Sequence, residues 1–220
     1  SAYTGSEIPA PELRRICEWA FNFPIELKQT GERKYSLELF HGPTAAFKDF
    51  GARFMSQCFR YFADTKKKTV VLVATSGDTG GAIANSFLGI ENIDVIILYP
   101  SGKVSAIQEK QLTTPGHNIT ALEVKGTFDD CQAMVKKAFT RFDTRGRINL
   151  TSANSINIAR LIPQSFYYYW AISRLEGQVP AISVPSGNFG NMTGAMLARE
   201  TGLPVECFIA STNINRVVPD

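Results

Sequence analysis

The stretch HGPTAAFKDFGARFM occupies residues 41–55 and decides how the rest of the chain is expected to fold. Read as a helix that is entered at residues 43–44, it carries apolar side chains at spacings of three and four. They form one apolar arc along the helix. The members of this arc are Phe47, Phe50, Gly51, Phe54, Met55 and Cys58. Asp49 and Arg53 fall on the opposite side, where we expect solvent. Lys48 falls at the edge of the apolar arc.

Lys48 is the candidate catalytic residue. An apolar wall removes water from the amine and lowers its pKa, and a neutral amine can attack a carbonyl carbon to form a Schiff base. The alternative is a structural lysine whose side chain runs along the edge of a buried helix to reach water. This stretch by itself leaves both interpretations open.

The composition is that of a globular chain. Its 220 residues are 44% hydrophobic, which suffices for one large or two small domains. The net charge is +3, and no basic stripe with interleaved aromatic residues occurs, so nucleic acid is not an expected partner. No Cys-x-x-Cys occurs, and we expect neither a metal site nor disulfides from the four dispersed cysteines, Cys17, Cys58, Cys131 and Cys207.

The apolar runs are short. None is long enough to cross a membrane, and no signal-peptide pattern opens the sequence. We therefore expect a cytoplasmic protein that does not bind membranes. The sequence does not define an oligomeric state, and we favour a monomer.

Strand-like and helix-like patterns alternate along most of the chain. A helix is expected at residues 9–21 and a strand at 34–40. Further strands are expected at 69–75, 93–99, 119–124, 147–150, 181–185 and 204–210. The helices between them are expected at 82–88, 104–112, 127–142, 156–175 (kinked at Pro163) and 192–201. Strands that are hydrophobic on both faces predict an α/β fold with a doubly wound, mostly parallel sheet.

Two strand-to-helix loops have the composition of ligand-binding turns. Each places glycines and small polar side chains at a helix N-terminus, where N–H groups and the helix dipole favour an anion. Neither contains Gly-x-Gly-x-x-Gly or a P-loop lysine, so a dinucleotide site is not supported. We expect both loops at the same edge of one sheet, although an ordinary tight turn remains the alternative for each. Their residues are Ser76, Gly77, Asp78 and Thr79 in the first, and Ser186, Gly187, Asn188, Phe189, Gly190 and Asn191 in the second.

The two loops should bind different groups. Asp78 would repel a phosphate, so the first loop is expected to face a hydrogen-bond donor. The second loop has no acid and is the better phosphate cradle. A third polar cluster at a helix start, with a nearby loop cation, could reach a second phosphate or carboxylate, or could be an ordinary helix cap with a surface arginine. It consists of Ser152, Asn154, Ser155, Asn157 and Arg160, with Lys103 as the loop cation.

These stretches together resemble the threonine synthase family of fold-type II pyridoxal-phosphate enzymes, which have the tryptophan-synthase-β-like fold. The bacterial and fungal branch is the most similar. The matching motifs occur in the family's order and span most of the chain. They are LFHGPT at 39–44, FKDFG at 47–51, ATSGDTG at 74–80, SANSIN at 152–157 and VPSGNFG at 184–190.

The resemblance implies a role for each motif. Lys48 would hold pyridoxal 5'-phosphate as a Schiff base and later move protons. The loop at 186–191 would bind the cofactor phosphate, and the loop at 76–79 would bind the substrate carboxylate and the 3'-oxygen side of the cofactor. Asp78 stands where many relatives have asparagine. The substrate phosphate would be held by Asn154, Ser155, Asn157, Arg160 and Lys103.

The implied reaction converts O-phospho-L-homoserine and water into L-threonine and phosphate. Residues 1–64 would carry the cofactor lysine, 65–150 a small α/β lobe and 151–220 the start of the larger phosphate-binding lobe. Family members are longer at both ends, so the resemblance implies a fragment with little activity alone, and the partner of the pyridine nitrogen would lie beyond Asp220. The alternatives are a related fold-type II lyase (a serine/threonine dehydratase or a phosphohomoserine phospholyase) and a non-catalytic phosphate-binding module.

Overall fold

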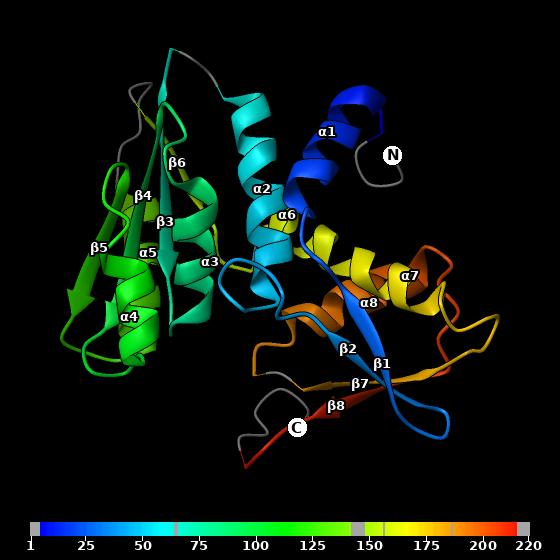
Figure 1. Cartoon of the computed structure of the whole chain (residues 1–220). Coiled ribbons are helices and arrows are strands. Elements are labelled where there is room, and N and C mark those ends of the chain that lie inside the picture. Colours follow the sequence, from blue (N-terminus) through cyan, green and yellow to red (C-terminus); the bar gives the residue numbers. More distant parts are fainter. Residues whose placement is uncertain (1–4, 64–65, 142–147, 156, 186, 215–220) are drawn as a thin grey trace.

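The computed structural model describes residues 5–63, 66–141, 148–155, 157–185 and 187–214 (Figure 1). Its strands form three sheets. A parallel sheet of four strands has the order β5-β4-β3-β6, with β3 at Lys68–Ala74, β4 at Ile93–Pro100, β5 at Ile119–Val124 and β6 at Ile148–Ser152. The two smaller sheets are the antiparallel hairpin of β1 (Glu26–Gly31) and β2 (Lys34–Glu38) and the parallel pair of β7 (Ala181–Pro185) and β8 (Cys207–Ser211).

The parallel α/β fold expected from the sequence is confirmed. The expectation that the loops after β3 and β7 lie at the same edge of one sheet is wrong, because β7 and β8 pair only with each other among the described residues. The strand β1 was not expected at all. Its sequence, ELKQTG, has no regular apolar alternation, and its pairing with β2 is what makes it a strand.

Helices cover both faces of the four-stranded sheet. On one face, Val71 and Val95 belong to a buried core together with side chains of α3 (Asp78–Phe87) and α4 (Ala106–Thr113). On the other face, Leu72 and Leu98 pack against α5 (Phe128–Arg141). Burying a side chain of this size contributes about 1.5–3 kcal/mol. Burial on both faces accounts for the continuous β-branched runs in these strands.

Helix α2 (Lys48–Phe62) lies in the middle of the molecule, between α1 (Ala10–Ala20) and α3 (Figure 1). The helix begins at Lys48 rather than at residues 43–44, because the preceding segment forms a turn in which Ala45 has φ of 55°. The expectation of a solvent-facing side is wrong as well. Asp49 is 0% and Arg53 is 6% exposed, since neighbouring helices surround the first turns of α2.

Arg53 is buried although some of its partners are exposed. Its guanidinium donates hydrogen bonds to the carbonyls of Ala20 (2.8 Å) and Trp19 (2.6 Å) and to the side chain of Asn22 (2.8 Å). It also lies 4.2 Å from the centre of the Trp19 ring. These contacts fasten the C-terminal end of α1 to α2 and compensate for the desolvation of the charge.

The long helix expected at 156–175 is interrupted. The structure has α6 (Ile158–Leu161), a 3₁₀ turn η1 (Ile162–Ser165) that contains Pro163, and α7 (Phe166–Ile172). The missing N–H and the ring of proline account for this break. A second core joins α2, α7 and α8 (Gly190–Glu200), and its members include Phe50, Tyr167 and Ala195.

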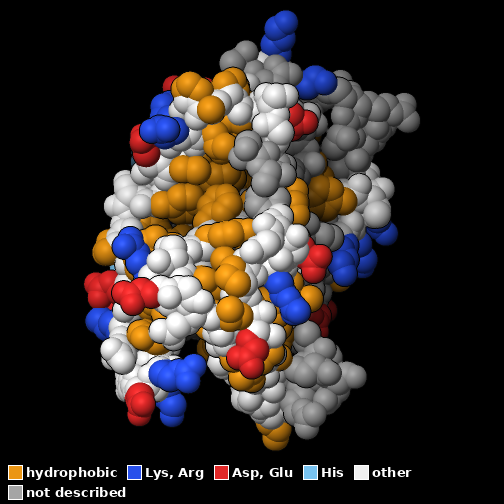
Figure 2. Space-filling model, turned by 90° about the vertical axis from the view of Figure 1, so that its right-hand side faces the viewer, with side chains coloured by type: hydrophobic (Ala, Val, Ile, Leu, Met, Phe, Trp, Pro, Cys, Tyr) orange, Lys and Arg blue, Asp and Glu red, His pale blue; other side chains and the backbone are white. Residues whose placement is uncertain are grey.

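The surface carries exposed apolar side chains on several elements, among them Trp19 of α1, Tyr169 of α7 and Met196 of α8. Figure 2 shows hydrophobic side chains gathered on one face, with charged groups around them. Within the described ranges, no helix has both the length and the apolar character that a membrane crossing requires.

Candidate active site

A cavity of about 780 Å³ opens at the carboxyl end of β3. It contains side chains from α2, from the loop after β3, from the segment after β6 and from the loop after β7. Parallel strands present their carboxyl ends and the following loops at one side, where ligands bind in such folds. The cavity brings together nine of the residues selected from the sequence, namely Lys48, Ser76, Asp78, Thr79, Ser152, Asn154, Ser155, Asn157 and Asn188.

The other selected residues do not line this cavity. Lys103 is exposed on the loop after β4, and Gly77 is buried beneath the Gln108 side chain. Phe189 and Asn191 are buried at the start of α8, and Ser186 lies outside the described residues. Gly187 and Gly190 flank Asn188 without lining the cavity themselves.

Arg160 requires a correction. Its side chain is 2% exposed, and its Nη1 donates a 2.6 Å hydrogen bond to the carbonyl of Ala153. The residue packs against Gly51, and burial lowers the pKa of the guanidinium to about 10. In this structure Arg160 therefore joins α6 to α2 and is not placed to hold a substrate phosphate.

Lys48 projects from the first residue of α2 into the cavity. Its side chain is 22% exposed, and its Nζ lies 4.2 Å from the centre of the Phe47 ring. Burial lowers the pKa of the Lys48 amine below its usual value, and the positive charge of Arg160 lowers it slightly further. The carboxylate of Asp78, 3.5 Å away, acts in the opposite direction. A partly desolvated amine of this kind has the properties of a nucleophile that attacks carbonyl groups.

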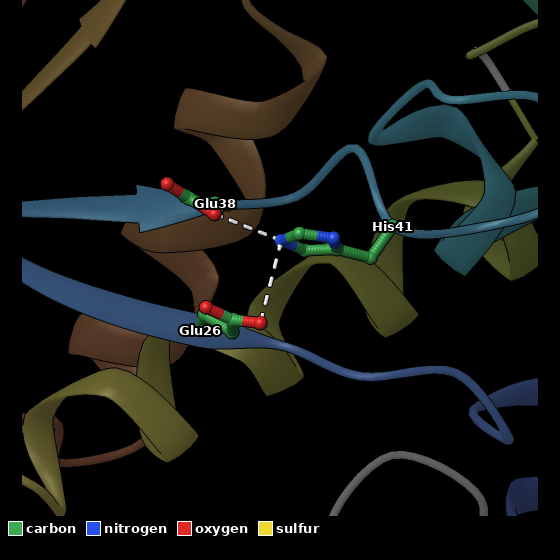
Figure 3. A group of neighbouring side chains, drawn as sticks. All are labelled: Glu26, Glu38 and His41. Carbon is green, nitrogen blue, oxygen red and sulfur yellow. Dashed lines mark hydrogen bonds and ion pairs between the residues drawn. The ribbon is translucent and has the colours of Figure 1, made fainter.

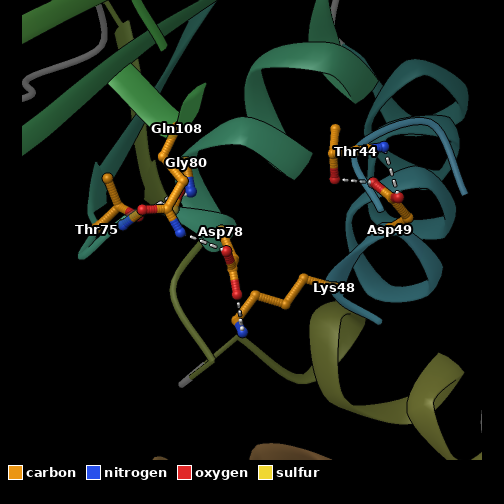
Figure 4. A network of polar contacts seen from close by, with 8 residues as sticks. Thr44, Lys48, Asp49, Thr75, Asp78, Gly80 and Gln108 are labelled. Atoms are coloured by element: carbon orange, nitrogen blue, oxygen red, sulfur yellow. Dashed lines mark hydrogen bonds and ion pairs between the residues drawn. The ribbon is translucent and has the colours of Figure 1, made fainter. Parts of the chain in front are cut away.

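The loop after β3 is organised by a residue that the sequence analysis did not select. The Thr75 hydroxyl accepts hydrogen bonds from the backbone N–H groups of Gly77 (3.0 Å) and Gly80 (2.9 Å) (Figure 4). Two backbone N–H groups at this helix start are thus already used within the loop. The side chains of Ser76 and Thr79 line the cavity, so they are the groups this loop offers to a ligand.

Gln108 was also missed. It lines the cavity from the first turn of α4, and its Nε2 donates a 2.7 Å hydrogen bond to Asp78. The sequence did contain a signal for its orientation, because Ser105 and Gln108 have the Ser-x-x-Gln spacing of a capping box. Both hydrogen bonds of that box are present.

The asparagines of the third cluster serve the backbone. Asn154 accepts a hydrogen bond from the amide of Ala74 (3.1 Å) and donates one to its carbonyl (2.7 Å), which joins the ends of β3 and β6. Asn157 caps α6 by accepting from the amide of Ala159 at 3.0 Å. The interpretation as structural caps therefore holds for these side chains, although both also line the cavity.

The loop after β7 reaches the same cavity through Asn188. Phe189 adopts the left-handed conformation with φ of 50°, and α8 begins at Gly190. The first N–H groups of an α-helix have no acceptor within the helix and attract a phosphate. An amine and the N-terminus of an 11-residue helix beside one cavity are the chemical groups that a phosphate-bearing aldehyde cofactor requires.

A separate cluster joins the β1–β2 hairpin to the segment before α2 (Figure 3). Glu26 and Glu38 are directly opposite each other on the two strands, and the Nε2 atom of His41 lies 2.9 Å from Glu38 and 4.0 Å from Glu26. Three such donors could hold a metal ion. However, the ammonium of Lys28 already lies 3.2 Å from Glu38 and 3.4 Å from Glu26. A cation of the chain itself thus balances the two facing carboxylates.

Comparison with known proteins agrees with this geometry. The chain is 49% identical over 221 residues to a threonine synthase from Haemophilus influenzae, a match that covers 99% of this chain and 52% of that protein. The crystal structure of the threonine synthase from Escherichia coli superposes with a TM-score of 0.93 at 48% identity, covering 100% of this chain and 52% of that one. A threonine synthase from Brucella melitensis, solved with pyridoxal phosphate bound, gives a TM-score of 0.86 at 39% identity and covers 96% of this chain and 48% of that one.

The chain spans about half the length of the curated relatives it matches. The superpositions confirm the fold-type II architecture expected from the sequence. The sequence profile of pyridoxal-phosphate dependent enzymes matches residues 25–218. The chain therefore belongs to the family of pyridoxal-phosphate dependent enzymes.

Proposed function

We propose that the protein containing this chain is a threonine synthase, which converts O-phospho-L-homoserine and water into L-threonine and phosphate with pyridoxal 5'-phosphate as cofactor. The observation that carries the proposal is the position of the Lys48 amine, partly desolvated and in one cavity with Asn188 at the start of α8. The similarity to threonine synthases across the whole chain supports the choice of substrate. When bound, the cofactor would act as an electron sink that stabilises carbanions formed on the substrate.

The residues of the chain divide the work by their chemistry. Lys48 would hold the cofactor covalently and carry protons to and from the substrate carbons, since its partly desolvated amine lines the cavity. The backbone at the start of α8, next to Asn188, binds the cofactor phosphate. The hydroxyls of Ser76 and Thr79 hold the substrate carboxylate.

The substrate phosphate needs a cation. Arg160 is buried and does not line the cavity, whereas Lys136 of α5 lines it together with Ser155 and Asn157. We therefore assign the phosphate of O-phospho-L-homoserine to Lys136 and the polar side chains of Ser155 and Asn157.

The test uses the full-length protein. Added pyridoxal phosphate followed by borohydride reduction should attach the cofactor to the peptide that contains Lys48, and Lys48→Ala should abolish this attachment. A separate sample that carries pyridoxal phosphate and has not been reduced should release phosphate and L-threonine in equal amounts from O-phospho-L-homoserine. Attachment to another lysine, or phosphate release without L-threonine, would contradict the proposal.

A further inference from the structure

Gln108 links the start of α4 to the candidate catalytic amine. At the start of α4, the side-chain Oε1 of Gln108 accepts a 3.0 Å hydrogen bond from the backbone N–H of Ser105. The backbone N–H of Gln108 donates a 3.3 Å hydrogen bond to the Ser105 hydroxyl. The side chain is therefore fixed on its own helix by one end of its carboxamide. The other end, Nε2, points away from α4.

That free end reaches the loop after β3. Nε2 of Gln108 donates a 2.7 Å hydrogen bond to Oδ1 of Asp78, and the other oxygen of Asp78 lies 3.5 Å from Nζ of Lys48 (Figure 4). The carboxamide lies so close to Gly77 that a Cβ at that position would overlap it, and Gly77 has φ of 138°. The close approach thus depends on a glycine in the loop.

We propose that Gln108 is a positioning residue that holds the Asp78 carboxylate toward the Lys48 amine. Asp78 needs such support because its side chain is 47% exposed, and an exposed carboxylate that pairs with a single amine has many competing rotamers. A second hydrogen bond to the other carboxylate oxygen restricts these rotamers. The amide of Gln108 is well suited to this role, since it donates to Asp78 without adding a charge.

The charges that face Lys48 determine the sign of the effect. Asp78 from α3 favours the ammonium form, whereas burial and Arg160 from α6 favour the neutral amine. Lys136 from α5 lines the same cavity. Loss of the Gln108 hydrogen bond should release Asp78 toward solvent, so the pKa of Lys48 should fall further.

The test measures the ionisation of Lys48 without cofactor or substrate. The full-length, cofactor-free protein is acetylated with a small reagent at a series of pH values, and the modification rate of Lys48 is obtained by peptide mass mapping. Gln108→Met keeps the side-chain length and removes the donor. At pH values below the midpoint of the profile it should raise the rate roughly two- to fivefold, as expected from the loss of an exposed ion pair. The midpoint should move to lower pH, whereas a change in access alone would alter only the plateau.

Two matched variants separate positioning from folding. Ser105→Ala weakens the same helix start but keeps the Gln108 amide, so it should leave the midpoint unchanged. In an Asp78→Asn background, Gln108→Met should cause no further shift, because the carboxylate that it acts through is gone. An equal shift in Ser105→Ala, or an undiminished shift in the Asp78→Asn background, would overturn the inference.

This inference deepens the proposed function, because it takes Lys48 as the catalytic amine. The two can fail separately. A failure of cofactor attachment to Lys48 would overturn the proposed function and leave the labelling result standing. An unchanged labelling midpoint in Gln108→Met would remove the role of Gln108 and leave the proposed function standing.

Discussion

The carboxylate of Asp49 accepts two hydrogen bonds from Thr44, one from the hydroxyl at 2.6 Å and one from the backbone amide at 2.9 Å (Figure 4). Both carboxylate oxygens are used, and the side chain is completely buried. The pair closes the turn that precedes α2, and Lys48 is the first residue of that helix. The direction in which the catalytic amine leaves the helix therefore depends on a neighbouring acid.

Replacing this acid by its amide should destabilise the fold. Asp49→Asn keeps an acceptor for the Thr44 backbone amide, but its NH₂ group forces the Thr44 hydroxyl to accept instead of donate, so a hydrogen bond to a carboxylate becomes a weaker neutral one at a cost of about 1 kcal/mol. Urea unfolding measures the effect. The matched control is Asp129→Asn on the exposed first turn of α5, which should change the stability by only a few tenths of a kcal/mol. Equal losses in both variants would contradict the role of the Thr44 contacts.

The same pair predicts a pH dependence. Burial raises the pKa of the Asp49 carboxyl above its usual value, although the Thr44 hydrogen bonds oppose this. Folding therefore favours the neutral carboxyl, and the stability that this shift confers is fully present below the unfolded pKa of the carboxyl and is lost as the pH rises through the folded pKa. The stability difference between the native protein and Asp49→Asn should grow as the pH is lowered from 7 toward 4. Urea unfolding of both proteins at each pH gives this difference, in which the contributions of the other titrating groups cancel. A difference that becomes smaller as the pH is lowered would contradict the raised pKa of Asp49.

Gly51→Ala should be destabilising even though Gly51 lies inside a helix. Alanine is ordinarily better than glycine there by about 1 kcal/mol. At this position a Cβ would come within 2.6 Å of the carbonyl oxygen of Arg160, which is backbone and cannot turn aside. We expect a loss of about 1–3 kcal/mol from overpacking between α2 and α6. The control variant is Gly190→Ala, because a Cβ at Gly190 would meet only an ordinary contact at 3.7 Å. A stabilising effect of Gly51→Ala would contradict the close approach of α2 and α6.

Arg160→Ala should act on stability and not on phosphate recognition. The side chain is buried and bonded to a backbone carbonyl, so its removal should cost about 2–5 kcal/mol. In full-length protein that remains folded, the KM for O-phospho-L-homoserine should stay nearly unchanged. Lys136→Ala should instead raise this KM about tenfold or more, because it removes a charge-assisted hydrogen bond to the substrate phosphate. The reverse pattern in the kinetics would restore Arg160 as the phosphate ligand.

The cysteines should differ sharply in alkylation. Burial raises the pKa of the Cys58 thiol to about 12 and also raises the pKa of Cys131. The thiolate is the reactive form, so both should remain almost unmodified by iodoacetamide at pH 8. Cys207 of β8 is exposed and should react first. Peptide mapping before and after unfolding gives the order, and early modification of Cys58 in the folded protein would contradict it.

Local patterns sufficed for most elements of the parallel sheet. Strands such as β3 and β4 are hydrophobic on both faces, so their sequences alone identify them. The burial of Asp49 and Arg53 could not be predicted, because it depends on α1 and α6 packing against α2, which the helical period does not encode. The separation of β7 and β8 into a second sheet likewise depends on contacts distant in the chain.

The residues of the candidate site also divide into those that local sequence motifs predict and those that depend on long-range packing. Lys48, Asp78 and Asn188 were found because motifs at strand ends and helix starts have a fixed place in parallel folds. Arg160 was placed incorrectly, since a long side chain can turn toward a cavity or into the core from the same backbone position. Gln108 has no motif of its own for binding Asp78, and only the three-dimensional arrangement of α3 and α4 shows the contact.

The bond between Asn154 and Ala74 has a consequence for how the chain folds. It joins positions 80 residues apart, at the edge where β6 completes the four-stranded sheet. Closing so long a loop costs entropy before any contact compensates for it, so β6 should join the sheet late, after the local units β3–α3–β4 have formed. A weakened Asn154 contact would then accelerate unfolding far more than it slows folding. The segment that completes the cavity would thus be the last to form and the first to open.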